Sequence, residues 1–153
     1  MGIVKYDIFI YMYDYIYFDL DDTLIRDNPK TGKSEVLQSG YTKYLELKKE
    51  YPRLPFILFT NRLKSEIQYP NIYIFDEVIG KDDMERYIIK NIREVPFIEY
   101  LIPRNLYIYL QGLFLYKNSQ TPKVLYLFLR HISKGEKVCV EDDDRRVFLT
   151  FKL

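Results

Sequence analysis

Residues 15–24 read YIYFDLDDTL, an aromatic and β-branched run that ends in three carboxylates within four positions. The apolar half predicts a buried strand of a parallel sheet. Carboxylates this close together repel one another and raise each other's pKa unless a cation keeps them ionised. Ligand sites form at the carboxyl ends of parallel strands, and carboxylate oxygens are hard ligands that suit Mg²⁺. We therefore expect Asp19, Asp21 and Asp22 to lie at a ligand-binding site rather than to stabilise the fold.

The rest of the chain alternates between strand-like and helix-like segments. The predicted strands are residues 7–19, 56–59, 71–79 and 137–141. The predicted helices are residues 40–50, 63–68, 82–93 and 121–132, the last closed by Gly135. Residues 26–33 have turn chemistry, and residues 106–116 fit either a strand or a hairpin. Such alternation predicts an α/β fold, a doubly wound parallel sheet flanked by helices.

Polar side chains follow three of these predicted strands. Asp19 and Asp21 come at the end of the first strand, Thr60 follows residues 56–59, and the acids of residues 141–144 come at the end of the last strand. In a doubly wound sheet the carboxyl ends of neighbouring strands share one crevice. These groups are remote in sequence, and we expect them to converge in space.

Composition limits the classes to which this chain can belong. Its 153 residues, 48% of them hydrophobic, predict one compact domain over residues 1–153. The net charge of +1 provides no global field for a nucleic acid, and the sequence has no dedicated nucleic-acid-binding motif. It also has no apolar run of membrane-spanning length and no signal-peptide pattern, so a cytoplasmic protein is expected.

Three residue types invite functional interpretations that their surroundings disfavour. The single cysteine, Cys139, lies in a strand-like segment, where a buried, inert thiol is expected. The sixteen tyrosines mostly alternate with aliphatic residues, so their rings are expected to pack on sheet faces rather than to stack on bases. The single histidine, His131, follows Arg130 near a helix end, where a cation would complement the helix dipole.

Residues 19–23, DLDDT, resemble the D-x-D-x-T signature of the haloacid dehalogenase (HAD) superfamily, and further motifs follow in superfamily order. The resemblance implies a HAD-like fold and a Mg²⁺-dependent phosphatase in which Asp19 attacks phosphorus and forms an aspartyl-phosphate. It implies that Asp21 is the general acid and then the general base, with a backbone carbonyl that binds Mg²⁺. Thr23 is expected to brace the loop by hydrogen bonds, whereas Asp22 occupies the variable position of the motif.

The second and third motifs would hold the phosphoryl group. Residues 56–61, FILFTN, resemble the second motif, in which Thr60 and Asn61 would bind a phosphoryl oxygen through a hydroxyl and backbone N–H groups. The third motif is a lysine that neutralises the phosphoryl group and the nucleophile. Lys123, at the start of the helix before the last strand, fits this motif in order and position, and Lys81 is the alternative.

The fourth motif is an apolar strand followed by acids that complete the metal site. Residues 138–143, VCVEDD, resemble its double-aspartate variant, with Glu141 where an apolar residue is usual. An alternative register uses residues 143–145, Asp-Asp-Arg, as in polynucleotide 3′-phosphatase domains. The Mg²⁺ ligands implied by the first and fourth motifs are Asp19, Asp21, Asp142 and Asp143.

The spacing of the motifs leaves little room for the cap insertions with which HAD enzymes choose substrates. About forty residues separate Asp19 from Thr60, enough for one turn and one helix. A capless or minimally capped enzyme with an open cleft is therefore expected. Such a cleft admits macromolecular phosphoesters, either phosphoproteins such as those with phosphotyrosine or nucleic-acid 3′-phosphates. The candidate residues at its rim are Arg26, Lys30, Lys33, Arg62 and Lys64.

A second class of protein is consistent with the same residues. A catalytically weak HAD-fold protein that binds phosphate or a partner is the alternative, because Glu141 and the altered surroundings of the third-motif lysine depart from the family pattern. The intact Asp19 and Asp21 favour the enzyme. A phosphotransferase is disfavoured, since such relatives usually carry larger caps.

Overall fold

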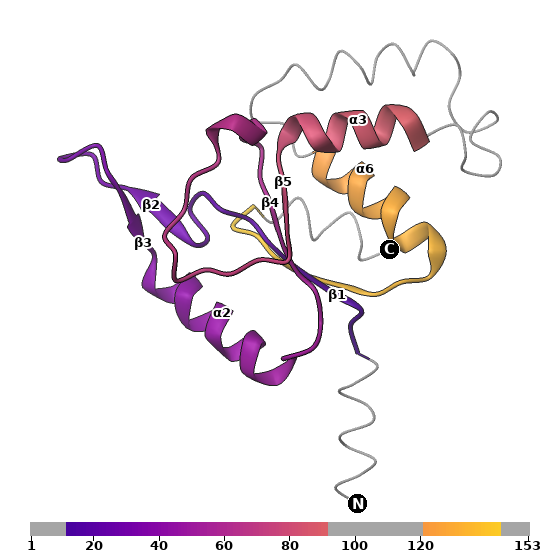
Figure 1. The fold of residues 1–153 in the computed structure, drawn as a ribbon, viewed down its shortest axis with the longest axis horizontal. Helices are drawn as coiled ribbons and strands as arrows, with labels where there is room; N and C mark the ends of the chain where they lie inside the picture. The colour runs from indigo at the N-terminus through magenta and orange to yellow at the C-terminus, as the bar shows by residue number, and fades with distance from the viewer. Residues whose placement is uncertain (1–11, 92–120, 145–153) are drawn as a thin grey trace, which may run out of the picture.

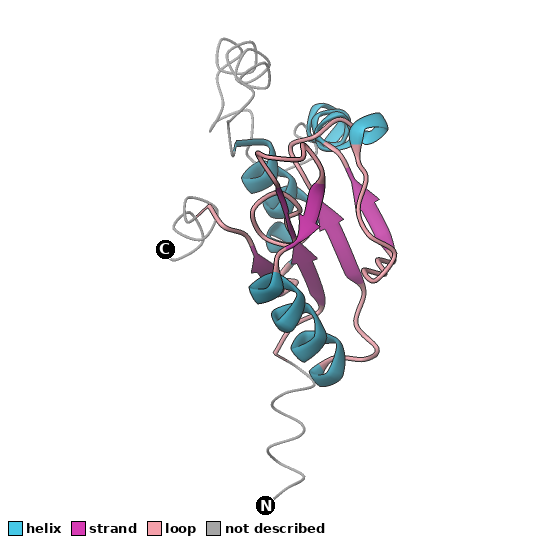
Figure 2. Ribbon diagram, turned by 90° about the vertical axis from the view of Figure 1, so that its left-hand side faces the viewer, coloured by secondary structure: helices cyan, strands magenta, loops and turns pink. Residues whose placement is uncertain are grey.

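The centre of the structure is a four-stranded parallel sheet. The structure is a computed structural model that describes residues 12–91 and 121–144. The sheet, whose strands are magenta in Figure 2, contains β1 (Tyr15–Phe18), β4 (Phe56–Phe59), β5 (Glu77–Ile79) and β6 (Val138–Glu141). Hydrogen bonds between neighbouring strands give the order β5–β4–β1–β6. Every neighbouring pair is parallel, and Phe18 of β1 lies opposite Leu58 on one side and Glu141 on the other. The carboxyl end of β1 therefore lies between those of β4 and β6.

Helices cover both faces of this sheet. Figure 1 shows α2 (Gln38–Glu50) on one side and both α3 (Lys81–Asn91) and α6 (Thr121–Arg130) on the other. The α/β prediction, a parallel sheet flanked by helices, is confirmed. From β1 the chain runs through α2 to β4 and β5 on one side, and it later returns through α6 to β6 on the other side. Such a reversal of strand order is the place where α/β sheets form ligand sites.

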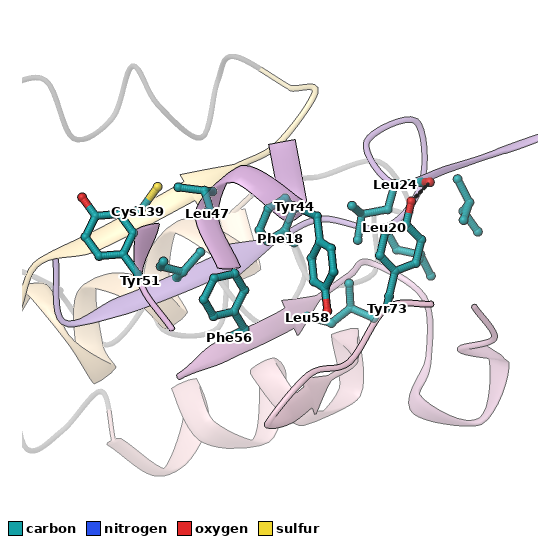
Figure 3. Close-up of a cluster of buried hydrophobic side chains, with 12 residues drawn as sticks. Phe18, Leu20, Leu24, Tyr44, Leu47, Tyr51, Phe56, Leu58, Tyr73 and Cys139 are labelled. Carbon is teal, nitrogen blue, oxygen red and sulfur yellow. Dashed lines mark hydrogen bonds between the residues drawn. The ribbon is translucent and has the colours of Figure 1, made fainter. Parts of the chain in front are cut away.

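Alternation of side chains along β1 divides the core into two layers. Phe18 packs on the α2 side with Tyr44 and Leu47 (Figure 3). Tyr17 points to the opposite face, where it packs with Met84 of α3 and with side chains of α6. Because both faces are buried, the strands consist of almost continuous apolar runs. Full burial of each such side chain stabilises the fold by about 1.5–3 kcal/mol.

Aromatic rings form much of this core. The buried tyrosines among the described residues are Tyr17, Tyr44, Tyr51, Tyr73 and Tyr126. The rings of Tyr44 and Tyr73 meet edge to face, with centroids 5.2 Å apart. Of these tyrosines only Tyr17 lies in a strand, so the prediction that tyrosine rings pack on sheet faces is confirmed for Tyr17, whereas the others reach the core from helices and loops. Cys139 is buried as well, and burial raises the pKa of its thiol to about 11, which fits the inert thiol expected there.

A short hairpin between β1 and α2 was not predicted. Strand β2 (Ile25–Asp27) pairs antiparallel with β3 (Ser34–Val36), and the sequence predicted only the turn between them. Figure 1 shows the hairpin projecting away from the sheet. Its residues are mostly exposed polar ones, so it lacks the apolar alternation that identifies a strand.

Several predicted boundaries were wrong. The segment 71–79 is a strand only at Glu77–Ile79, because residues before it form turns and irregular backbone from which Tyr73 packs into the α2 layer. The helix predicted at 63–68 is a single 3₁₀ turn, η1 (Lys64–Glu66). In the first predicted strand, residues 12–14 are not part of a strand and β1 begins at Tyr15, while its predicted residues 7–11 lie outside the described part. The segment predicted at 106–116 also lies outside it.

The end of α6 differs from the prediction as well. The helix stops at Arg130, and η3 (Ile132–Lys134) follows before Gly135 adopts the expected left-handed φ of 77°. His131 is buried, with Nε2 hydrogen-bonded to the Tyr17 hydroxyl and Nδ1 3.2 Å from Glu136 Oε1. Burial lowers the pKa of His131 despite the opposing effect of Glu136. The prediction of a cation at the helix end is therefore wrong.

Gly40 brings α2 into direct backbone contact with the loop after β1. A Cβ atom at this position would lie 1.7 Å from the carbonyl oxygen of Thr23, which is far inside van der Waals contact. No other residue type fits there without displacing the helix or the loop. The absence of a side chain at Gly40 thus allows α2 to lie directly against the loop that carries Asp19 and Asp21.

Gly40→Ala is expected to lower the free energy of unfolding by at least about 2 kcal/mol, because the added methyl group forces backbone atoms apart. Urea denaturation followed by tyrosine fluorescence measures this change. Ser39→Ala is the matched control, since Ser39 is exposed in the same turn and its substitution should change stability by less than about 0.5 kcal/mol. Equal stability of the two variants would contradict the close contact.

Candidate functional site

Three chain segments meet at the carboxyl edge of the sheet. Asp19 follows β1, Thr60 follows β4, and Asp142 follows β6. The backbone N–H of Asp19 donates to the carbonyl oxygen of Glu141 over 2.9 Å, so the loop after β1 is tied to the end of β6. The parallel sheet thus brings together side chains that are more than a hundred positions apart, as the sequence predicted.

A buried lysine links the first and last of these segments. Lys123, in the first turn of α6, places Nζ 2.7 Å from Asp19 Oδ1 and 2.7 Å from Asp142 Oδ2. The side chain of Lys123 is 2% exposed, and those of Asp19 and Asp142 are 8% and 0% exposed. Its ammonium group also lies 4.8 Å from the centroid of the Phe59 ring. A charge this deeply buried requires partners, and the two carboxylates supply them.

The structure distinguishes the two lysines that the sequence left open. Lys123 contacts Asp19, whereas Lys81 lies at the start of α3 with Nζ 3.9 Å from Glu85 Oε1. Of these two lysines, Lys123 is therefore the one that contacts the predicted nucleophile.

Hydrogen bonds from neighbouring loops hold the two carboxylates. Thr23 Oγ1 donates to Asp19 Oδ2 over 3.2 Å, and it accepts a bond of 3.1 Å from the backbone N–H of Asp143. The backbone N–H of Asp144 donates to Asp142 Oδ1 over 2.9 Å. Thr23 braces the loop as predicted and also connects it to the segment after β6.

Burial strongly perturbs the ionisation of this cluster. Burial raises the pKa of Asp19 to about 7, with Lys123 opposing the rise and Asp142 adding to it. Burial also raises the pKa of Asp142 against the lowering effect of Lys123. Burial alone would lower the pKa of Lys123, but the two carboxylates outweigh it and raise that pKa. One ammonium group thus serves two carboxylates, which leaves an excess of negative charge at the site.

Three of the four predicted metal ligands lie together. Asp19, Asp142 and Asp143 each offer a carboxylate oxygen, and these oxygens all lie within 4.8 Å of one another. Several carboxylate oxygens at this spacing, with a net negative charge, fit the hard oxygen ligands that Mg²⁺ prefers. A hollow of about 200 Å³ is lined by Asp142 and Asp143, of which Asp143 is exposed whereas the Asp142 side chain is fully buried. The cluster therefore offers carboxylate oxygens of the kind that a divalent cation uses, and Asp143 is its solvent-exposed member.

The carboxylate of Asp21 is not part of this cluster. It accepts a hydrogen bond of 2.8 Å from Arg62 Nε through Oδ2 and a second one from the terminal Arg62 nitrogen through Oδ1. Metal binding through the carboxylate of Asp21 is therefore not supported, whereas the contact implied by the resemblance uses its backbone carbonyl. Sequence reasoning placed Arg62 at the rim but missed this ion pair, for which the sequence contains no signal.

Thr60 and Asn61 directly follow β4 at the carboxyl edge of the sheet. Thr60 is 1% exposed, and its backbone N–H donates to the carbonyl oxygen of Ile79 over 3.0 Å. Its hydroxyl accepts a 3.2 Å bond from the backbone N–H of Arg62. Asn61 follows directly and is half-buried. The loop after β4 is therefore firmly held next to the carboxyl end of β1.

Comparisons with known proteins identify no relative: no family model, no curated protein and no solved structure matches the chain. None of the helices in residues 12–91 and 121–144 is long and apolar enough to cross a membrane.

Proposed function

We propose that this chain is a Mg²⁺-dependent phosphomonoester hydrolase of the HAD type. The observation that carries this proposal is the buried Lys123 held between Asp19 and Asp142, with Asp143 beside them. A stable fold gains little from burying two carboxylates and one ammonium group, since desolvation offsets their attraction. Such an arrangement at the carboxyl end of parallel strands is instead typical of a site that handles charged ligands.

Asp19 is the nucleophile in this proposal. One carboxylate oxygen attacks phosphorus, so a bond forms between that oxygen and phosphorus while the bond to the leaving oxygen breaks. Lys123 holds the other oxygen of Asp19 at 2.7 Å and thereby fixes the direction of the carboxylate. Its positive charge also stabilises the negative charge that accumulates when the phosphoryl group approaches Asp19.

Asp21 supplies and removes the proton. It donates a proton to the leaving oxygen, then takes one from the water that attacks the aspartyl-phosphate, which releases inorganic phosphate and restores Asp19. The hydroxyl of Thr60 and the backbone N–H groups around Asn61 would hold the phosphoryl oxygens. Asp19, Asp142, Asp143 and the backbone carbonyl of Asp21 would hold Mg²⁺. When bound, the ion neutralises charge on the phosphoryl group.

The first interval in which a cap could lie, between Asp19 and Thr60, is short. Between Asp19 and Thr60 the structure has only the β2–β3 hairpin and α2, which fits the expected absence of a large cap in that interval. The second interval in which a cap could lie includes residues 92–120, outside the described part. An open cleft favours macromolecular substrates, either a phosphoprotein or a nucleic-acid 3′-phosphate.

Hydrolysis of p-nitrophenyl phosphate by the purified chain tests the proposal. We expect turnover with Mg²⁺ and loss of turnover when EDTA removes the ion. Phosphotyrosine peptides, 3′-phosphorylated oligonucleotides and sugar phosphates assayed side by side would identify the substrate class. Turnover of none of them would contradict the proposal. It would favour the alternative, a protein that binds phosphate without hydrolysing it, because both oxygens of Asp21 are engaged by Arg62.

Mg²⁺ affinity is expected to rise as the pH increases from about 6 to about 8. The pKa of Asp19 is about 7, above its ordinary value, so the carboxyl group takes up a proton as the pH falls through 7. A metal ion requires the ionised form, and its binding therefore releases protons at the lower pH. Titration calorimetry in two buffers of different ionisation enthalpy measures both effects. An affinity that does not change with pH would contradict the raised pKa.

A further inference from the structure

Arg62 and Asp21 form a two-pronged ion pair beside the cluster. The Nε atom of Arg62 donates a hydrogen bond to Oδ2 of Asp21, and a terminal guanidinium nitrogen donates one to Oδ1. The side chains are 26% and 45% exposed, respectively, so the pair is open to solvent on one side. This is the geometry with which arginine binds carboxylates and phosphates in general.

The backbone of Arg62 is fixed on both sides, which makes the side chain the only adjustable part. Its N–H donates to Thr60 Oγ1 over 3.2 Å, and its carbonyl oxygen accepts a 2.8 Å bond from the N–H of Lys81. Gly80 packs against the same carbonyl oxygen, where a Cβ atom would lie 3.0 Å away. The guanidinium group can therefore change position only by rotation of the Arg62 side chain, since the backbone of this residue is held in place.

The ion pair conflicts with the proposed role of Asp21. Both oxygens of Asp21 are engaged by Arg62, so neither is free to reach a leaving oxygen. The pair must open during each turnover. Once it opens, Arg62 presents an unfilled pair of donors close to the site that Thr60 and Asn61 would provide for the scissile phosphoryl group. A second anion with two oxygens in one plane fits those donors as the carboxylate does.

We propose that Arg62 binds a second phosphate group of the substrate, adjacent to the one that is hydrolysed, and that this exchange releases Asp21. The inference rests on the proposed function and narrows its substrate class. The carboxylate of Asp21 occupies the place of the second phosphate while no substrate is present. The preferred substrates are phosphomonoesters that carry a neighbouring phosphate, either a monoester as in a small bisphosphate or a diester as in a nucleic-acid end.

Matched nucleotides test this inference. Thymidine 3′-monophosphate has one phosphate, thymidine 3′,5′-bisphosphate adds a monoester, and the 3′-phosphorylated thymidine dinucleotide carries a diester instead. We expect either second phosphate to raise kcat/KM for release of the 3′-phosphate by about 10- to 100-fold, the range of a charge-assisted pair of hydrogen bonds. A gain confined to the dinucleotide would assign the second phosphate to a nucleic-acid backbone, and a gain confined to the bisphosphate to a small molecule.

Variants of Arg62 separate binding of the second phosphate from a structural role. In Arg62→Gln the ratio of kcat/KM with and without the second phosphate should fall to about one, and in Arg62→Lys it should fall to an intermediate value because the charge remains without the planar pair of donors. Arg86→Gln is the matched control, since Arg86 forms an arginine–aspartate pair with Asp83 on the exposed side of α3. That variant should keep the wild-type ratio.

Three outcomes would overturn the inference. The wild type could hydrolyse the monophosphate and the bisphosphates equally, which would leave the proposed function intact. Arg62→Gln or Arg62→Lys could lower kcat/KM for all substrates by the same factor, which would show that Arg62 acts only on Asp21 or on the fold. Turnover of no nucleotide and no aryl phosphate would remove the proposed function together with this inference. Circular dichroism and the thermal midpoint show whether each variant is folded.

Discussion

Asp19→Asn is expected to lower kcat for p-nitrophenyl phosphate by at least about 10⁴-fold, because the amide cannot attack phosphorus and no neighbouring group replaces it. The fold should survive the change. Asparagine has the same shape, and Lys123 keeps its bond of 2.7 Å to Asp142. Steady-state kinetics with Mg²⁺, together with the midpoint of thermal unfolding, separates loss of chemistry from loss of structure.

Asp22→Asn is the control for this experiment. It removes the same charge from the same loop, but Asp22 is exposed and pairs with Arg26 at 3.5 Å. Its backbone has a positive φ of 59°, which asparagine adopts readily. Activity within a few-fold of the wild type is expected. Normal turnover by Asp19→Asn would rule out the aspartyl-phosphate mechanism, and equal losses in the two variants would point to charge alone.

Lys123→Met is expected to lower the free energy of unfolding by about 3–5 kcal/mol at neutral pH and above, since it leaves two buried carboxylates without their cation. Methionine is of similar length, so lost packing contributes little. The loss should shrink as the pH falls, because burial raises the pKa of Asp19 and loss of Lys123 raises it further, so the carboxyl group takes up a proton and no longer needs a partner. Urea denaturation followed by tyrosine fluorescence suits a chain with sixteen tyrosines and no tryptophan.

Two further variants support the interpretation of this result. Combining Lys123→Met with Asp142→Asn should recover part of the lost stability, because the double variant contains only one of the two buried carboxylates, that of Asp19, without its cation. Lys49→Met, on the exposed last turn of α2, should change stability by less than about 0.5 kcal/mol. A Lys123→Met protein as stable as the wild type would mean that the ion pairs with Asp19 and Asp142 are not what holds the cluster together.

The two predictions also address different parts of the proposal. Asp19→Asn tests the chemistry, whereas Lys123→Met tests the electrostatic design that places Asp19 and Asp142 together. If the cluster binds Mg²⁺, the ion should stabilise Lys123→Met more than the wild type, because Asp19 and Asp142 have lost the buried ammonium group that contacts them in the described part of the chain. That comparison links the stability of the site to the proposed cofactor without an activity measurement.

Much of the sheet could be predicted because its strands are buried on both faces. The predicted strands 56–59 and 137–141 match β4 and β6 to within one residue, since apolar runs of this length are typical of strands in a parallel sheet. The end of the first strand, predicted at residue 19, lies one residue earlier at Phe18, where Asp19 interrupts the apolar run. The convergence of Asp19, Thr60 and Asp142 at one edge then follows from parallel pairing.

The errors occurred where local pattern and tertiary contact disagree. Residues 71–76 have strand-like aromatic residues, yet Tyr73 donates its hydroxyl to the carbonyl oxygen of Leu24 and packs against α2 instead of pairing in the sheet. His131 lies at a helix end, yet the side chain is buried against Tyr17 of β1. In both cases a partner far along the chain determined the outcome, and a local pattern does not contain that partner.

The sequence by itself determined the α/β architecture and the edge of the sheet at which the polar groups gather. Both follow from the local pattern of apolar residues and from the alternation of strand-like and helix-like segments along the chain. Only the tertiary structure decided that Lys123 contacts Asp19 and that Arg62 binds Asp21. It also decided that Gly40 lies against the loop after β1. These contacts depend on side-chain distances of a few ångströms between segments brought together by folding. A charge pair or a close approach of this kind is set by packing geometry, and no spacing along the chain encodes it.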